Sequence, residues 1–168
     1  MNNNNESRIY IACLASYNNG ILHGQWIDAN QEASDLESEI QTILAKSPIA
    51  NAEEWAIHDY DNFGSIRISE YETMETISNI AEQISEHGTL FAEVYSYTNN
   101  LDDAQQMLQD RYIGTYDSIL EYVEETTDLS EVPEHLQYYI DLDSLARDIE
   151  LSGEITTFEV DAQIAIFS

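Results

Sequence analysis

Carboxylates are by far the most numerous ionisable side chains in this sequence, and they recur at helical spacing. Asp and Glu number 33 against five Lys and Arg, which gives a formal net charge of −28. Acids three, four or seven positions apart share one face of a helix. We expect thirteen of them to form an anionic surface: Glu32, Asp35, Glu39, Glu75, Glu82, Glu86, Asp103, Asp110, Asp117, Glu121, Glu124, Glu125 and Asp128.

The densest stripe of acids lies on a helix that we predict over residues 116–127. Its carboxylates are Asp117, Glu121, Glu124, Glu125 and, at its end, Asp128. They give one charge per roughly 3 to 4 Å, close to the spacing of about 3.4 Å along one DNA strand. Like charges four residues apart destabilise a helix by roughly 0.2 to 0.5 kcal/mol per pair, and no Lys or Arg offsets them. This favours a surface whose negative field is itself functional over an ordinary solvated face.

A calcium-binding loop is the main alternative use of these acids. Residues 59–70 place acids at positions 1, 3 and 12 of an EF-hand loop and glycine at position 6. Position 5 is Phe63, which offers no side-chain oxygen, and position 9 is the cation Arg67. The alternative interpretation of this segment is a turn that follows a strand.

Catalytic and zinc-binding patterns are not evident in the sequence. The four histidines are scattered and the single cysteine, Cys13, cannot build the usual zinc spacings. The sequence contains neither a nucleophile elbow nor a phosphate-binding glycine loop. Carboxylate pairs must occur, but no pair stands out and a phosphate substrate would be repelled. We therefore expect no catalytic residue, no metal and no cofactor.

The charge also limits the possible partners. Solubility needs a net charge of only about 2 to 8 in a small domain, and a larger excess costs stability through self-repulsion. Such a surface repels nucleic acids and anionic membranes and attracts a strongly basic partner. No apolar run is long enough to span a membrane, the polar start (residues 1–6) is expected to be a disordered tail, and a single cysteine excludes an internal disulfide. These features favour the cytoplasm.

The periodicity of apolar residues predicts an α+β fold. An N-terminal α+β domain is expected over residues 1–69, with strands at 8–14, 21–28 and 54–60 and a helix at 32–46. A middle helical domain is expected over residues 70–111. Its first helix opens at a capping box in residues 69–72 and closes at Gly88, residues 89–98 are ambiguous, and Asn100 caps a further helix.

A C-terminal domain of helices and a small sheet is expected over residues 112–168. Besides the helix at 116–127, we predict helices at 135–140 and 142–151, the latter ended by Gly153, and strands at 155–160 and 163–167. Five of the eleven tyrosines gather in this part of the chain, either packed within it or at a subunit interface: Tyr112, Tyr116, Tyr122, Tyr138 and Tyr139.

Several short motifs, in their order and spacing, resemble the ArdA antirestriction family. They are Tyr10-Ile-Ala, Tyr17-Asn-x-Gly20, Gly24-x-Trp26, His58-Asp-Tyr60, Gly114-Thr-Tyr-Asp-Ser118 and the stretch 129–141. A last segment resembles that family's antirestriction motif and comprises Leu145, Ala146, Arg147, Asp148, Ile149, Glu150, Leu151 and Gly153.

The resemblance implies three small domains in an elongated chain and a homodimer joined through the C-terminal domain near the antirestriction motif. It also implies a non-enzymatic mimic of bent B-form DNA. The partner would be the DNA-binding groove in the methyltransferase core of a type I restriction-modification enzyme, so that restriction and modification are both blocked. Family members are often carried on plasmids and conjugative elements. A decoy for another basic DNA-binding protein and a calcium-binding module remain the alternatives.

Overall fold

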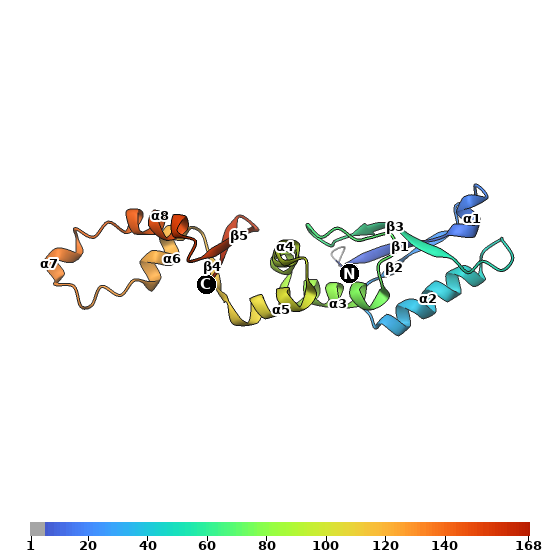
Figure 1. The fold of residues 1–168 in the computed structure, drawn as a ribbon, viewed down its shortest axis with the longest axis horizontal. Coiled ribbons are helices and arrows are strands. Elements are labelled where there is room, and N and C mark those ends of the chain that lie inside the picture. Colours follow the sequence, from blue (N-terminus) through green and yellow to red (C-terminus); the bar gives the residue numbers. More distant parts are fainter. Residues whose placement is uncertain (1–5) are drawn as a thin grey trace, which may run out of the picture. The chain divides into compact units, whose positions relative to one another are not determined.

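The computed structural model describes residues 6–168, and in this part of the chain it contains eight helices and two antiparallel three-stranded sheets (Figure 1). The α+β class predicted from the sequence is confirmed. The chain divides into two compact units, Met1–Ser96 and Tyr97–Ser168, with one sheet in each. The tail expected at residues 1–6 lies, apart from Glu6, outside the described residues.

The first unit is built on the sheet β2-β1-β3, whose central strand is β1 (Arg8–Cys13). Strands β2 (Gly24–Asp28) and β3 (Trp55–Asp61) pair antiparallel on either side of it. Ile9 and Ile11 of β1 are fully buried. Helix α2 (Ala33–Ala45) lies along one side of this sheet and packs its own apolar face toward β1 and β2 (Figure 1).

The predicted strand at residues 21–28 is wrong at its start. The short helix α1 (Leu14–Asn18) follows β1 directly, and β2 begins only at Gly24. Gly20, with a positive φ of 73°, ends the turn. Gly24 is the first residue of β2. A Cβ there would meet the backbone carbonyl of Ile11 and the ring of Tyr10, so the position requires glycine. The hairpin is therefore present, but with a longer connection than Asn-Asn-Gly alone suggested.

Helix α3 (Met74–His87) and most of helix α4 (Thr89–Thr98) complete the first unit. Helix α3 packs against α2 and buries Met74, Ile77, Ile80 and Ala81. The predicted capping box at residues 69–72 is wrong: Thr73 is the N-cap, and its hydroxyl accepts a hydrogen bond from the Thr76 N–H at 3.2 Å. The ambiguous segment is helix α4 (Thr89–Thr98), which starts directly after Gly88.

The second unit holds the sheet β4-β6-β5 and the remaining helices. Its elements are α5 (Leu101–Asp110), β4 (Tyr112–Tyr116), α6 (Ile119–Thr126), α7 (Glu134–Gln137), α8 (Leu142–Ser152), β5 (Thr156–Val160) and β6 (Gln163–Phe167). The central strand is β6, which pairs antiparallel with both neighbours. Helix α6 packs against α8, and α7 lies in the long loop that joins them (Figure 1).

The single helix predicted over residues 116–127 is wrong in its first turn. Tyr116 belongs to β4, where it pairs with Ile164 of β6. Ser118 is the N-cap, and its hydroxyl accepts a hydrogen bond from the Glu121 N–H at 3.1 Å. Helix α6 is therefore shorter than predicted. Helix α7 is also shorter than the predicted 135–140, whereas Gly153, in the left-handed conformation, ends α8 as expected.

Candidate partner-binding surface

Every carboxylate of the chain lies at the surface. All 33 Asp and Glu fall within residues 6–168, and none of them is buried. Of the thirteen predicted site residues, eleven are exposed, and Glu39 and Glu121 are partly covered. Burying an ionised carboxylate without a partner would cost many kcal/mol, so the fold has to place this charge outside. That the thirteen carboxylates form a partner-binding surface remains a prediction.

In the first unit, amphipathic helices separate the charge from the core. On α2, four apolar side chains face inward: Leu36, Ile40, Ile43 and Leu44. Glu32 is the N-cap residue of this helix, Asp35 lies in its first turn, and Glu39 accepts a hydrogen bond from Gln31 at 3.0 Å. Carboxylates near a helix N-terminus interact favourably with its dipole, so Glu32 and Asp35 also stabilise α2.

Helix α3 repeats this arrangement. Glu75, Glu82 and Glu86 are exposed and lie seven and four residues apart, beside the buried face of the helix. The Glu86 carboxylate lies 3.8 Å from Nε2 of His87. Because both side chains are substantially exposed, this contact leaves the negative field of the stripe largely intact.

On α5, the two predicted carboxylates occupy opposite ends of the helix. Asp103 is in the first turn, where its N–H is held at 3.0 Å by the side chain of Asn100, the predicted cap. Asp110 is the last residue of the helix, where a negative charge opposes the helix dipole. The stability of α5 therefore explains an acid at Asp103 but not at Asp110.

The stripe around α6 differs most from its prediction. Only Glu121, Glu124 and Glu125 lie on the helix, because Asp117 precedes the cap and Asp128 follows the last turn. The Glu121 carboxylate accepts a hydrogen bond from the Asp117 N–H at 2.6 Å, so part of its charge serves the helix start. The spacing of one charge per 3 to 4 Å, calculated for a continuous helix, does not apply across these five residues.

Hydrogen bonds favour the ionised form of two exposed carboxylates of the second unit and lower their pKa. The Ser130 side chain and N–H lower the pKa of Asp128, whose Oδ1 accepts from that N–H at 2.9 Å. The Ser144 side chain and N–H lower the pKa of Asp141, the N-cap of α8. Both groups are therefore charged at neutral pH.

Cations neutralise very little of this surface. Arg8 pairs with Asp61 at 2.9 Å and lies over the Trp26 ring, 4.9 Å from its centroid. Within residues 6–168, no Lys or Arg forms a salt bridge with any of the thirteen predicted carboxylates. The anionic surface is consequently available to cations from another molecule.

The predicted antirestriction motif occupies most of α8 and its C-terminal cap. Ala146 is buried and Leu145 and Ile149 are partly covered, and the helix as a whole packs against α6. Exposed on the helix are Arg147, Asp148, Glu150 and Leu151, and Gly153 caps the helix end. The motif thus combines a packing face with a charged face, and Leu151, 78% exposed, belongs to neither.

The calcium-binding alternative finds no assembled site in the described part of the chain. Residues 6–168 contain no group of three or more His, Cys, Asp or Glu side chains that could hold a metal ion. The segment resembling an EF-hand loop begins within strand β3, and Asp61 is engaged by Arg8. The next helix begins only at Met74. Across the same residues, no helix is sufficiently long and apolar to traverse a membrane.

Some exposed acids escaped the search for regular spacing. Glu37 lies on α2 outside the stripe, and Glu53 and Glu54 precede β3 without any repeat. Glu53 and Glu54 adjoin Trp55 in the sequence, but Glu37 and Tyr71 join them only in the folded unit. No periodic signal could have found this arrangement, since it joins a helix, a strand and a loop.

These features define a class: an α+β protein that displays a folded, unneutralised polyanionic surface. Comparison with protein-family models matches residues 9–162 to the family described as "Antirestriction protein (ArdA)". The chain therefore belongs to the ArdA family of antirestriction proteins, and the resemblance seen in its motifs is confirmed. A search of curated proteins gives no match.

Membership of this family establishes the general activity. The chain is an antirestriction protein that inhibits type I restriction-modification systems. Proteins of the family are non-enzymatic inhibitors, so the carboxylates described above are not catalytic groups. The target implied by the family is the type I restriction-modification enzyme.

Proposed function

We propose that the chain inhibits its target by DNA mimicry, with its carboxylates in the positions that DNA phosphates take in the groove of the methyltransferase core. The observation that carries the proposal is that all 33 carboxylates are at the surface and the thirteen predicted ones have no Lys or Arg partner in residues 6–168. A DNA-binding groove is lined with Lys and Arg that normally neutralise phosphates. The Lys and Arg of the groove would therefore pair with carboxylates that have no such partner within the described part of the chain.

The mechanism is competition between two polyanions for one groove. The negative field attracts the basic groove over a long range and accelerates encounter. Binding then excludes DNA, and no bond is made or broken. Restriction and methylation fall together because both require DNA in the groove. Since the target acts on DNA inside the cell, we place the chain in the cytoplasm.

We further infer a homodimer with −56 formal charges, twice the −28 of one chain. Exposed apolar side chains in the second unit support a contact there, near the antirestriction motif: Leu136, Tyr138, Tyr139, Ile140 and Leu151. We also propose three small domains, residues 1–69, 70–111 and 112–168, in an elongated chain. The helices α3, α4 and α5, which follow the first sheet and precede the second in the sequence, support the middle domain.

A charge-reversal experiment tests the mimicry. Glu124→Lys combined with Glu125→Lys reverses two exposed charges on α6. Inhibition of a purified type I enzyme should weaken about tenfold. The slope of log inhibition constant against log salt should fall by about one for each carboxylate that no longer pairs with a cation of the groove. Restriction and methylation should be released in parallel.

The matched control is Glu124→Asp with Glu125→Asp, which keeps both charges and should inhibit like the wild type. Inhibition that is indifferent both to salt and to the charge reversal would show that the polyanionic surface does not contact the groove. Release of restriction without release of methylation would exclude competition for a shared DNA site.

A further inference from the structure

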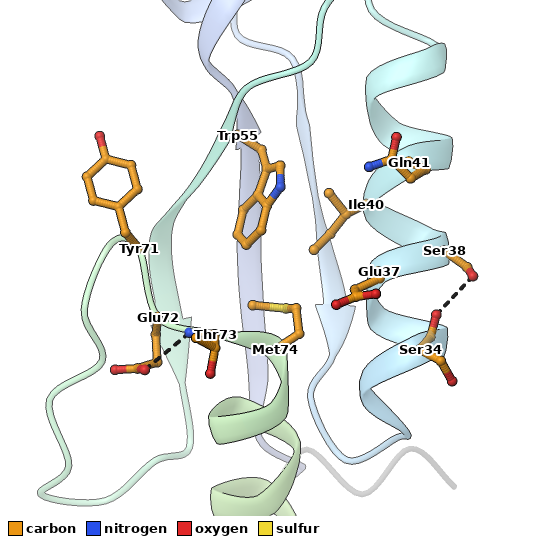
Figure 2. A pocket seen from close by; sticks show the side chains of 10 residues that line it. All are labelled: Ser34, Glu37, Ser38, Ile40, Gln41, Trp55, Tyr71, Glu72, Thr73 and Met74. Atoms are coloured by element: carbon orange, nitrogen blue, oxygen red, sulfur yellow. Dashed lines mark hydrogen bonds between the residues drawn. The ribbon is translucent and has the colours of Figure 1, made fainter.

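A hollow of the first unit lies between α2 and the segment that leads into α3, and its cavity volume is about 850 Å³. Figure 2 shows the Trp55 indole at its centre, with Tyr71 on one side and Ile40 and Glu37 of α2 on the other. Met74 lies next to the indole. We call this hollow the Trp55 groove.

The floor of the Trp55 groove is rigid and apolar, and its wall is an exposed aromatic ring. Met74 and Ile40 are 4% and 1% exposed, so both are anchored in the core. Trp55 is half-buried at the start of β3, whereas Tyr71 is 69% exposed. Tyr71 therefore presents its ring to solvent beside the Trp55 indole, where a further side chain can stack on it.

Carboxylates surround the two aromatic rings. Glu37 is exposed on α2, and Glu72 is held at the rim by a hydrogen bond from the Thr73 N–H at 3.1 Å. A smaller hollow of about 330 Å³ shares Trp55 and Tyr71 and adds Glu53 and Glu54. Neither hollow is lined by Lys or Arg. Two aromatic faces are therefore enclosed by four acids and no cation.

We propose that the Trp55 groove binds one arginine side chain of the partner enzyme. A guanidinium group stacks on aromatic faces and pairs with carboxylates through its planar fork, while its aliphatic stem covers apolar surface. All three complementary features occur here: the Trp55 and Tyr71 rings, the Glu37 carboxylate and the apolar floor. The inference rests on the proposed DNA mimicry, and it adds a discrete anchor to a field that is otherwise spread over the surface.

The first test uses a minimal ligand and the full chain. N-acetyl-arginine amide is titrated while the two indole N–H resonances are followed by NMR, with Trp26→Phe used to assign them. The Trp55 resonance should shift and saturate with the arginine amide and stay in place with N-acetyl-citrulline amide, its uncharged analogue. An equal response to both ligands, or a response to neither, overturns the proposal.

The second test measures inhibition of a purified type I enzyme. Tyr71→Ser changes no charge and Glu37→Gln removes one, and each should weaken inhibition about fivefold. The matched controls are Tyr17→Ser, at a phenol 53% exposed elsewhere in the unit, and Asp59→Asn, at an exposed acid of β3. Both controls should change inhibition less than about twofold. Circular dichroism confirms that all four variants are folded.

The outcomes separate the groove from the general mechanism. If the wild type inhibits but Tyr71→Ser and Glu37→Gln behave like their controls, the groove proposal is overturned and DNA mimicry stands. If inhibition by the wild type is indifferent to salt and to the charge reversal at Glu124 and Glu125, the proposed mimicry fails, while the arginine titration still decides whether the groove binds a guanidinium group.

Discussion

Residues 1–96 and 97–168 carry nearly the same charge on very different cores. The first unit has 16 Asp and Glu against three Lys and Arg, and the second has 17 against two. Among the described residues, however, 21 apolar side chains are buried in the first unit and seven in the second. Apolar burial is the main favourable term in folding, so the second unit opposes the same self-repulsion with much less stabilisation.

The second unit also leaves more large apolar side chains in water. Tyr138 and Tyr139 are 91% and 80% exposed, and Leu151 is 78% exposed. The comparison teaches that a charged surface and a sufficient core are separate requirements. The first unit has both a charged surface and a large core. The second has a small core and exposed apolar side chains that a partner can cover.

The largest effect is expected from removing a core aromatic ring in each unit. Phe167→Ala in β6 and Phe91→Ala in α4 each delete a fully buried ring and should cost about 3 to 5 kcal/mol. With its smaller core, the second unit should unfold in Phe167→Ala while the first stays folded. The first unit should survive Phe91→Ala in destabilised form.

Hydrogen exchange of the full chain, resolved by residue, measures this difference. Loss of protection in both units together in Phe167→Ala would show that they fold as one cooperative body, and the contrast between their cores would then have no consequence for stability.

A smaller effect is expected from the exposed tyrosines of the second unit. Tyr138→Ser with Tyr139→Ser should weaken self-association about 10- to 100-fold, because buried aromatic side chains dominate interface energies. Sedimentation over a concentration series measures the association. Tyr17→Ser, at an exposed phenol of the first unit, is the control and should leave it unchanged. A monomeric wild type, or identical association in all three proteins, would contradict the inferred dimer contact.

The smallest effect concerns how the helix caps respond to acid. The N-cap of α3 is Thr73, which does not ionise, whereas that of α8 is Asp141. Hydrogen bonds from Ser144 lower the pKa of Asp141 below its ordinary value of 3.8. Its contribution to stability is therefore complete above about pH 4 and is lost as the pH falls through the lower, folded-state pKa. Acid should loosen the start of α8 before that of α3.

Ser144→Ala removes the hydroxyl that donates to Asp141 at 2.7 Å and should raise the pKa of Asp141 toward its ordinary value. A carboxyl-carbon NMR titration measures the change. Ser152→Ala, which removes a hydroxyl from the same helix without touching Asp141, provides the comparison. The same pKa in both variants would mean that the backbone N–H alone accounts for the shift.

Local patterns in the sequence predicted those elements whose residues carry their own signal. The helices α2 and α8, the closing strands β5 and β6, and the caps at Asn100 and Gly153 are all confirmed. Strand β4 was missed because it is specified by pairing with β6, about fifty residues away. Tyr116 also fits the helical spacing of Ile119, Leu120 and Val123, so the local pattern favoured a helix where the structure has a strand.

The exposure of the charged side chains was as predictable from the sequence as these helices and strands. Charge alone required the carboxylates to be exposed, and no Asp or Glu of the chain is buried. Their hydrogen bonds were not predictable, as the commitment of Glu121 to the Asp117 N–H shows. Nor was the Trp55 groove, because residues 37, 55 and 71 meet only after the sheet, α2 and the following loop have packed.

The two sheets become fully paired in different ways during synthesis on the ribosome, because the central strand is the first strand made in one sheet and the last in the other. In β2-β1-β3 the middle strand emerges first and has to wait for Trp55–Asp61 before both of its edges are paired. In β4-β6-β5 the two outer strands emerge first and have nothing to pair with until Gln163–Phe167 is made. A nascent chain interrupted before residue 163 would thus present a finished first sheet together with two unpaired strands, a form that cellular proteases readily recognise.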